Sequence, residues 1–185
     1  MKATGIVRRI DDLGRVVIPK EIRRTMRIRE GDPLEIYTDR EGEVIFKKYS
    51  PIGELSAFAT QYAETLHKTC GLSVIITDRD AVIAYAGVSK KDFADKSLTL
   101  DAEKLMELRS MYTYRDGADK IFATDDGENH FIRCAMPIIS GGDIIGCVAS
   151  LGEVSNERSR DALSPEVESK LILAAAGFLG RQIET

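Results

Sequence analysis

Four basic side chains near the start of the chain recur at the spacing of a single helix face. They occupy positions i, i+3, i+4 and i+7, which form one stripe along a helix, and they are Lys20, Arg23, Arg24 and Arg27. Like charges at this spacing repel each other by roughly 0.2–0.5 kcal/mol per pair, so an anion that compensates the stripe stabilises it. Arginine also grips a phosphate group or a guanine edge through two parallel hydrogen bonds. The stripe therefore predicts contact with a polyanion.

The charge of the chain is distributed unevenly. Three further arginines precede the stripe: Arg8, Arg9 and Arg15. Residues 1–50 carry a net charge of +3 and residues 51–185 carry −7, although the whole chain of 185 residues carries only −4. Contact with a polyanion depends on the local field more than on the total charge. We therefore expect a cationic domain over 1–50 and an acidic domain over 51–185; a basic face that is merely solvated is the alternative.

The basic residues need elements to position them, and residues 1–50 predict a short series. We expect strands at 4–10 and 16–18, a turn at 11–14, a helix over 20–27 that begins after Pro19, and a hairpin of 34–38 with 44–47. Fifty residues with few apolar side chains make a poor independent core. The first strands also lack a clean apolar–polar alternation, as expected if a second copy covers them. We therefore expect an obligate dimer.

Residues 51–185 predict an α+β domain with an antiparallel sheet. The expected elements are a helix over 52–70, strands at 72–77, 81–86, 120–123, 130–139 and 143–151, partial helix within 89–116, and a closing helix to residue 183 with Ser164 as its cap. The apolar side of that closing helix is expected to comprise Val167, Leu171, Ala174, Ala175, Phe178 and Leu179. Such an order of helix, sheet and helix is typical of a sensor domain.

The segment GRVVIPKEIRR at 14–24 resembles the swapped-hairpin DNA-binding domain of the AbrB-type transition-state regulators. The resemblance extends over residues 1–50. The resemblance implies a dimeric β-barrel of exchanged hairpins, tetramers formed as dimers of dimers, and control of spore-development genes. It also implies DNA contacts by Arg8, Arg15, Arg23 and Arg24, with Arg9 as an addition. Lys20 and Arg27 complete the candidate set because they belong to the stripe.

The second domain resembles the GAF-type sensor domains more loosely, through its layout and the closing stretch LILAAAGFLGRQIE at 171–184. In such domains the sheet and helices enclose a small-molecule pocket. The resemblance implies a regulatory and oligomerisation domain. The chain lacks the cyclic-nucleotide signature and a cysteine in a bilin-attachment context, so the effector is left open.

Two cysteines open an alternative function. A hairpin centred on residues 141–142 places Cys134 opposite Ala149. By the same register Cys147 lies opposite Met136, so the thiols are expected on one face, about 7–8 Å apart and too far apart for a disulfide. A thiol-based reductase is therefore an alternative, although cysteine is more often a small buried apolar residue.

No enzymatic, metal or cofactor site is expected elsewhere. His67 and His130 lack metal-ligand spacing, and no Ser/His/Asp set is discernible. The longest uncharged stretch, 171–180, has ten residues, whereas a membrane span needs about 20. Without a leader, and with an odd number of cysteines, the protein is expected in the cytoplasm.

The sequence thus predicts a sequence-specific, DNA-binding transcriptional regulator. Its expected partners are double-stranded DNA, further copies of itself and a small-molecule effector that is left open. An antitoxin is the other alternative, since swapped-hairpin domains also serve there. Antitoxin tails usually fold only on their toxin, whereas 51–185 is expected to fold independently.

Overall fold

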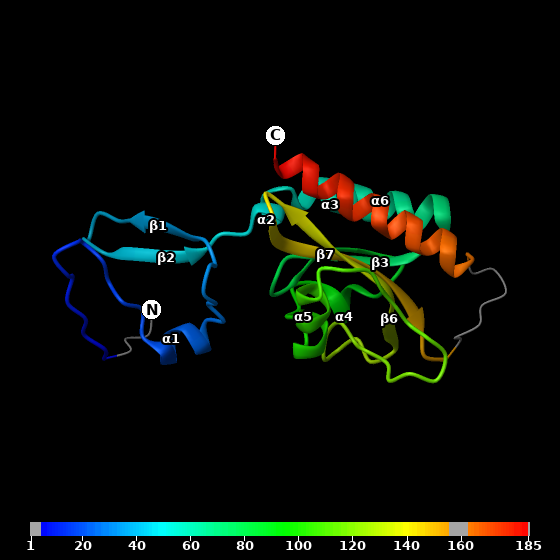
Figure 1. Ribbon diagram of the computed structural model, residues 1–185, viewed down its shortest axis with the longest axis horizontal. Coiled ribbons are helices and arrows are strands. Elements are labelled where there is room, and N and C mark those ends of the chain that lie inside the picture. Colours follow the sequence, from blue (N-terminus) through cyan, green and yellow to red (C-terminus); the bar gives the residue numbers. More distant parts are fainter. Residues whose placement is uncertain (1–4, 156–162, 185) are drawn as a thin grey trace. The chain divides into compact units, whose positions relative to one another are not determined.

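A computed structural model describes residues 5–155 and 163–184 of the chain. The chain divides into two compact units, Met1–Tyr49 and Ser50–Thr185, which are described separately (Figure 1). Thr4, where the first strand was expected to begin, lies outside the described residues. Within the described ranges, no helix has both the length and the apolar character needed to cross a membrane.

The N-terminal unit contains a short helix and a two-stranded antiparallel sheet. Helix α1 spans Lys20–Thr25 and follows Pro19, whose missing N–H costs nothing at a helix start. Strands β1 (Leu34–Thr38) and β2 (Val44–Lys48) pair with Ile36 opposite Phe46. The predicted hairpin and the start of the helix are therefore confirmed.

The two strands expected before α1 are not formed within this single chain. Residues 5–11 and 15–19 have no regular secondary structure. The N–H of Asp11 donates to the carbonyl of Arg15 at 3.1 Å, which closes the intervening turn, but no strand ladder continues from it in the described part of the unit. A strand requires a ladder of hydrogen bonds to a neighbouring strand, and the described residues of this unit form no such ladder with these segments.

The C-terminal unit is a five-stranded antiparallel sheet with helices on both faces (Figure 1). The strand order is β4-β3-β7-β6-β5, with β3 at Ser73–Thr77, β4 at Val82–Ala86, β5 at Tyr112–Thr113, β6 at His130–Ser140 and β7 at Asp143–Glu153. The helices are α2 (Pro51–Glu54), α3 (Ser56–Cys70), α4 (Lys90–Phe93), α5 (Leu100–Glu107) and α6 (Pro165–Ile183). The α+β class with an antiparallel sheet is confirmed.

Alternation along the strands divides the core into two layers. Val74 and Ile76 of β3 pack toward α3 and α6, against side chains such as Ile172. Ile75, between them, faces the opposite layer with Phe93 and the α5 side chains. Successive strand side chains point to opposite faces, and burial of each large apolar side chain contributes about 1.5–3 kcal/mol. The sheet is therefore stabilised from both sides.

Three expected elements differ from the structure. Residues 120–123 form only an isolated bridge between Phe122 and Phe131. The helix expected over 52–70 is interrupted at Leu55, which separates α2 from α3. On α6 the buried residues are Glu168, Ile172, Ala175, Ala176, Leu179 and Gly180, so the expected apolar side was only partly right. Val167 and Phe178 are 45% and 41% exposed, because α6 is apolar on more than one face and periodicity alone cannot select the buried one.

The register expected for the two cysteines was wrong by one residue. Near the turn, Ser140 pairs with Asp143 as expected. A bulge between Ile138 and Ile139 then shifts the ladder, and Cys147 pairs with Pro137. A one-residue shift turns a side chain to the other face of a sheet, so Cys134 belongs to the α3–α6 layer and Cys147 to the α4–α5 layer.

Candidate nucleic-acid interface

The structure places every basic residue of the candidate set on the surface of the N-terminal unit. The exposed residues are Arg8, Arg9, Arg15, Lys20, Arg23, Arg24 and Arg27. Helix α1 carries Lys20, Arg23 and Arg24 of the stripe. Arg23 and Arg24 lie in its last turn, where basic side chains interact favourably with the helix dipole. The helix thus presents a row of cationic groups to solvent.

Helix α1 ends before the last residue of the expected stripe. Arg27 has a φ of 51°, in the left-handed region, and its carbonyl accepts a hydrogen bond from Lys48 Nζ at 2.8 Å. Lys48 also lies 3.5 Å from the Asp32 carboxylate, and the N–H of Ile28 donates to the Arg23 carbonyl at 2.7 Å. Strand β2 therefore fixes the end of α1, and Arg27 extends the cationic surface from the following turn.

The turn before α1 is organised by Asp11. One carboxylate oxygen accepts hydrogen bonds from the N–H groups of Leu13, at 3.0 Å, and Arg15, at 2.8 Å. The other accepts from Arg15 Nε at 2.8 Å. Gly14 takes a φ of 77°, a conformation that glycine adopts without strain. Sequence reasoning assigned 11–14 to a turn but missed Asp11 as the residue that positions Arg15; an aspartate that opens such a turn is the available signal.

The N-terminal unit leaves most of its large apolar side chains in solvent. Among the described residues of 5–49, only Pro19 is buried. Val7 and Val17 are 85% and 70% exposed. The other exposed large apolar residues of the unit are Ile6, Ile10, Leu13, Val16, Met26, Ile36, Tyr37, Val44, Phe46 and Tyr49. A single copy of this unit therefore does not complete a hydrophobic core.

Cys134 and Cys147 of the C-terminal unit are poorly suited to nucleophilic chemistry. Burial raises the pKa of the Cys147 thiol to about 12, and burial also raises the pKa of Cys134. The thiolate is the reactive form, and the two residues lie in opposite layers of the sheet. Among the described residues, no three His, Cys, Asp or Glu side chains are grouped to hold a metal ion.

The cavity described between the sheet and α5 is very small. It measures about 10 Å³ and is lined by apolar side chains that include Leu105, Met106 and Ile132. A cavity needs roughly 10–15 Å³ to hold one water. Side chains of the chain itself therefore fill the interior on this face.

Comparison with known proteins assigns both units. Residues 54–184 match the family model described as "Stage V sporulation protein T C-terminal, transcription factor". Stage V sporulation protein T of Bacillus subtilis (strain 168) is 53% identical over 184 residues, covering 100% of this chain and 99% of that protein. The chain belongs to the stage V sporulation protein T family. This family is one of transcription factors, and sporulation regulation follows from membership.

Each unit of this family member also has relatives of its own. The N-terminal unit is 65% identical over 51 residues to the transition state regulatory protein AbrB of B. subtilis (strain 168), covering 28% of this chain and 52% of AbrB. The C-terminal unit resembles the GAF domain of a phosphoenolpyruvate-protein phosphotransferase from Coxiella burnetii, with a TM-score of 0.52 and 12% identity, covering 70% of this chain and 82% of that chain. The AbrB-like and GAF-like predictions are confirmed.

Residues 7–53 also match the model described as "Antidote-toxin recognition MazE, bacterial antitoxin". That match ends at residue 53, whereas the sporulation-protein relative aligns over the entire chain. The antitoxin alternative is therefore not favoured.

Proposed function

We propose that this member of the family regulates transcription by binding double-stranded DNA through its N-terminal domain, residues 1–50, as a dimer. The observation that carries the proposal is the exposure of all seven candidate basic side chains on one unit that is 65% identical to a transition state regulator. The contacts assigned to DNA are Arg8, Arg9, Arg15, Lys20, Arg23, Arg24 and Arg27. The residues 51–185 form the regulatory and oligomerisation domain.

The exposed apolar side chains support the dimer. Val7 and Val17 are exposed and lie in the segments 5–11 and 15–19, which have no regular secondary structure. A second copy of the same segments would supply strand neighbours and cover these side chains at once. The dimer then presents two sets of arginines to the duplex, one from each copy.

The arginines divide the work of recognition in this proposal. Most of them neutralise phosphates, which sets orientation and affinity, and a minority read base edges, which gives sequence specificity. Arg15 is held by Asp11 through its backbone N–H and its Nε, so its side chain is positioned before DNA arrives. Positioned donors lose less side-chain freedom on binding.

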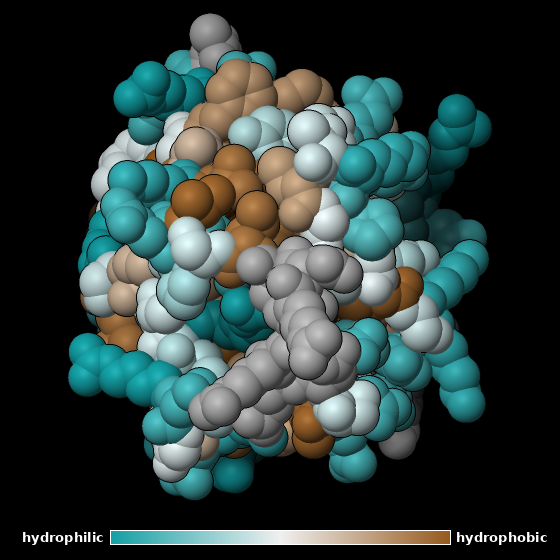
Figure 2. Space-filling model, turned by 90° about the vertical axis from the view of Figure 1, so that its right-hand side faces the viewer, coloured by the Kyte–Doolittle hydropathy of each residue, from teal (hydrophilic) through white to brown (hydrophobic). Residues whose placement is uncertain are grey.

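A second face of α6 supports a tetramer. Phe178 stacks on Tyr62 of α3 with ring centroids 5.6 Å apart and lies 5.7 Å from Phe58. Val167 and Ala174 continue this exposed apolar face along the helix. Figure 2 shows apolar side chains gathered within a mainly hydrophilic surface of the C-terminal unit. A second copy of this chain fits such a face, because the neighbouring stretch 171–180 carries no charge.

The regulatory domain in this proposal has no enzymatic role and needs no cofactor. Two of its three thiols, Cys134 and Cys147, are buried, and its net charge of −7 over 51–185 is unfavourable for contact with DNA. The protein would act in the cytoplasm, where its target genes are, and the regulatory domain would couple oligomeric state to DNA binding. An effector, if the domain takes one, would act on that coupling.

The test is DNA binding by Arg23→Ala and Arg24→Ala variants of the full chain. The matched control is Arg40→Ala, which removes an exposed arginine from the hairpin loop of the same unit. Loss of a base or phosphate contact costs about 1–3 kcal/mol, so each variant should bind operator DNA at least about fivefold more weakly than the control. The oligomeric state should not change. If all three variants bind DNA with equal affinity, α1 is not part of the DNA interface.

A further inference from the structure

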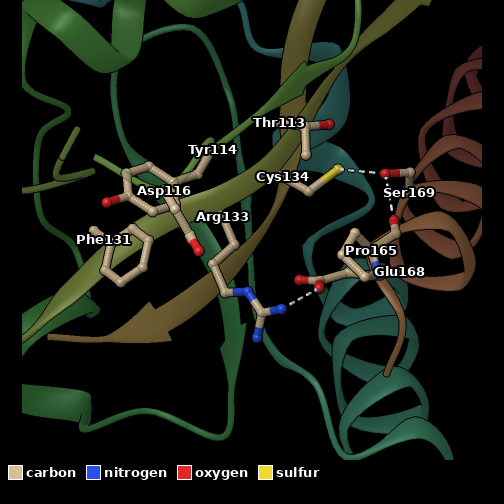
Figure 3. Close-up of a pocket in the computed structure, with 9 residues that line it drawn as sticks. All are labelled: Thr113, Tyr114, Asp116, Phe131, Arg133, Cys134, Pro165, Glu168 and Ser169. Carbon is tan, nitrogen blue, oxygen red and sulfur yellow. Dashed lines mark hydrogen bonds and ion pairs between the residues drawn. The ribbon is translucent and has the colours of Figure 1, made fainter. Parts of the chain in front are cut away.

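A small polar cavity lies on the α3–α6 face of the C-terminal sheet, away from the filled layer beside α5. It measures about 90 Å³ and lies between the β5–β6 edge and the first turns of α6 (Figure 3). One water needs roughly 10–15 Å³, so this cavity holds several waters or a small organic molecule. Its polar wall comprises Thr113, Tyr114, Asp116, Arg133, Glu168 and Ser169.

Arg133 reaches the cavity because it is the extra residue of a β-bulge. Ile132 pairs with Leu151 and Cys134 with Ser150, which leaves Arg133 without a partner on β7. A bulge redirects side chains that strict alternation would send to the other face, and both Arg133 and Cys134 line the cavity. The N–H of Tyr114 donates to the Arg133 carbonyl at 2.7 Å, which fixes the bulge.

Glu168 of α6 forms an ion pair with Arg133 in the wall of the cavity (Figure 3). Its side chain is only 4% exposed, and Oε2 lies 2.9 Å from Arg133 Nη2. The second oxygen, Oε1, is buried and has no hydrogen-bond partner. A buried charged oxygen without a donor is costly, and in native structures such atoms are rare. Oε1 is therefore a vacant acceptor for an N–H group.

The Arg133 guanidinium beside Glu168 offers the complementary chemistry. Arg133 engages Glu168 through Nη2, and its Nε and Nη1 make no hydrogen bond with the described residues, so they remain available to an anionic group. A ligand that carries only a negative charge is repelled by the carboxylates of Glu168 and Asp116. A ligand that carries only a positive charge is repelled by the guanidinium of Arg133. A molecule that carries an ammonium beside a carboxylate complements both of these adjacent groups.

We propose that this cavity binds a small free amino acid. The ammonium group donates to Glu168 Oε1, and the carboxylate accepts from the guanidinium of Arg133. The size of the cavity restricts the side chain to a few heavy atoms, as in glycine, alanine or serine. A ligand bound in this cavity contacts both Glu168 of α6 and Arg133 of β6. It therefore adds a second link between two elements that this ion pair already joins.

The test is titration of the full chain with alanine by calorimetry, without DNA, so that its outcome is independent of the proposed function. Glycine and serine serve as further probes, and ethylamine and propionate carry one charged group each. Alanine should show saturable binding, and ethylamine and propionate should bind at least about tenfold more weakly, because loss of one charge-assisted contact is worth a factor of that order.

Two variants locate the binding. Glu168→Gln removes the acceptor charge and should weaken alanine binding at least about tenfold. Glu166→Gln, a carboxylate exposed on the same helix, should leave it unchanged. If Glu168→Gln fails to fold, Arg133→Lys retains the charge, loses the planar fork and should also weaken binding. Absence of saturable binding of all three amino acids to the wild-type chain at millimolar concentration, or equal affinities of the cavity variants and the control, would overturn the proposal.

Discussion

Asp11 holds Arg15 by two different groups at once. One carboxylate oxygen accepts the Arg15 backbone N–H and the other accepts its side-chain Nε, both at 2.8 Å. The Arg15 guanidinium is therefore part of the cationic surface with its Nε bound to Asp11. Its terminal Nη groups can donate to a phosphate. The turn and the side chain are ordered by the same residue, so the geometry of Arg15 depends on the charge of Asp11.

The Asp11–Arg15 contact should persist to acidic pH. Hydrogen bonds from the Arg15 backbone and side chain hold the pKa of Asp11 below its ordinary value of 3.8. A lowered folded-state pKa means that the contact is present above pH 3.8 and is lost only as the pH falls through the lowered pKa. Carbon-13 NMR titration of the Asp11 carboxyl should give a midpoint below 3.8. In Arg15→Gln the midpoint should move upward; an identical midpoint in both proteins would contradict this assignment.

DNA binding should depend steeply on salt. Each phosphate contact releases counterions, so the logarithm of the binding constant falls by about 0.9 for each tenfold increase in salt per contact. If Arg15 contacts one phosphate, the Arg15→Ala variant should reduce the slope of log K against log salt by about 1. If both copies in a dimer make this contact, the slope should fall by about 2. Fluorescence anisotropy from low to moderate salt measures the slope, with Arg40→Ala as the control. A flat salt response in the wild type would exclude phosphate anchoring.

Replacement of Phe178 should separate the two association steps. Phe178→Glu places a charge against Tyr62 and Phe58 on the exposed α3–α6 face, and burial of that charge in an interface is unfavourable. Sedimentation should show dimers in place of tetramers, with the N-terminal dimer retained. Glu166→Ala, on a solvent-facing position of the same helix, should remain tetrameric. A tetrameric Phe178→Glu variant would place the second interface elsewhere.

The three cysteines should differ in reactivity. Burial raises the pKa of Cys147 to about 12, so at pH 8 it remains a protonated thiol that alkylates slowly. Cys70 is only half-buried and should react with iodoacetamide first. Mass spectrometry of the folded protein should find label on Cys70 long before Cys147. Labelling of Cys147 at the rate of Cys70 would reopen the thiol-based alternative.

Local sequence signals predicted the elements whose hydrogen bonds lie within one segment or one hairpin. Pro19 marks the start of α1, Gly71 follows the end of α3 with a φ of 68°, and Ser164 caps α6 by accepting from the N–H of Val167. Each signal acts within a few residues, so it can be recognised without the rest of the fold. The class of both domains followed from the same local patterns and from the matching segment at 14–24.

Longer-range relationships could not be predicted in the same way. The bulge beside Ile138 moved Cys147 to the other face. A glycine within a strand, such as Gly146, is compatible with a bulge but does not determine where the register shifts. The buried face of α6 was ambiguous because Val167 and Phe178 are as apolar as the residues that the sheet covers. Only the packing partner distinguishes such faces.

The sequence by itself determined the cationic stripe, the division of charge between two domains and the family-specific segment, because these depend on residue type and spacing alone. The tertiary structure decided that Asp11 orients Arg15, that a bulge turns Arg133 toward α6, and that Glu168 keeps one buried oxygen without a partner. Those relationships depend on where distant segments meet, and a one-residue change of register reverses which side chains face each other.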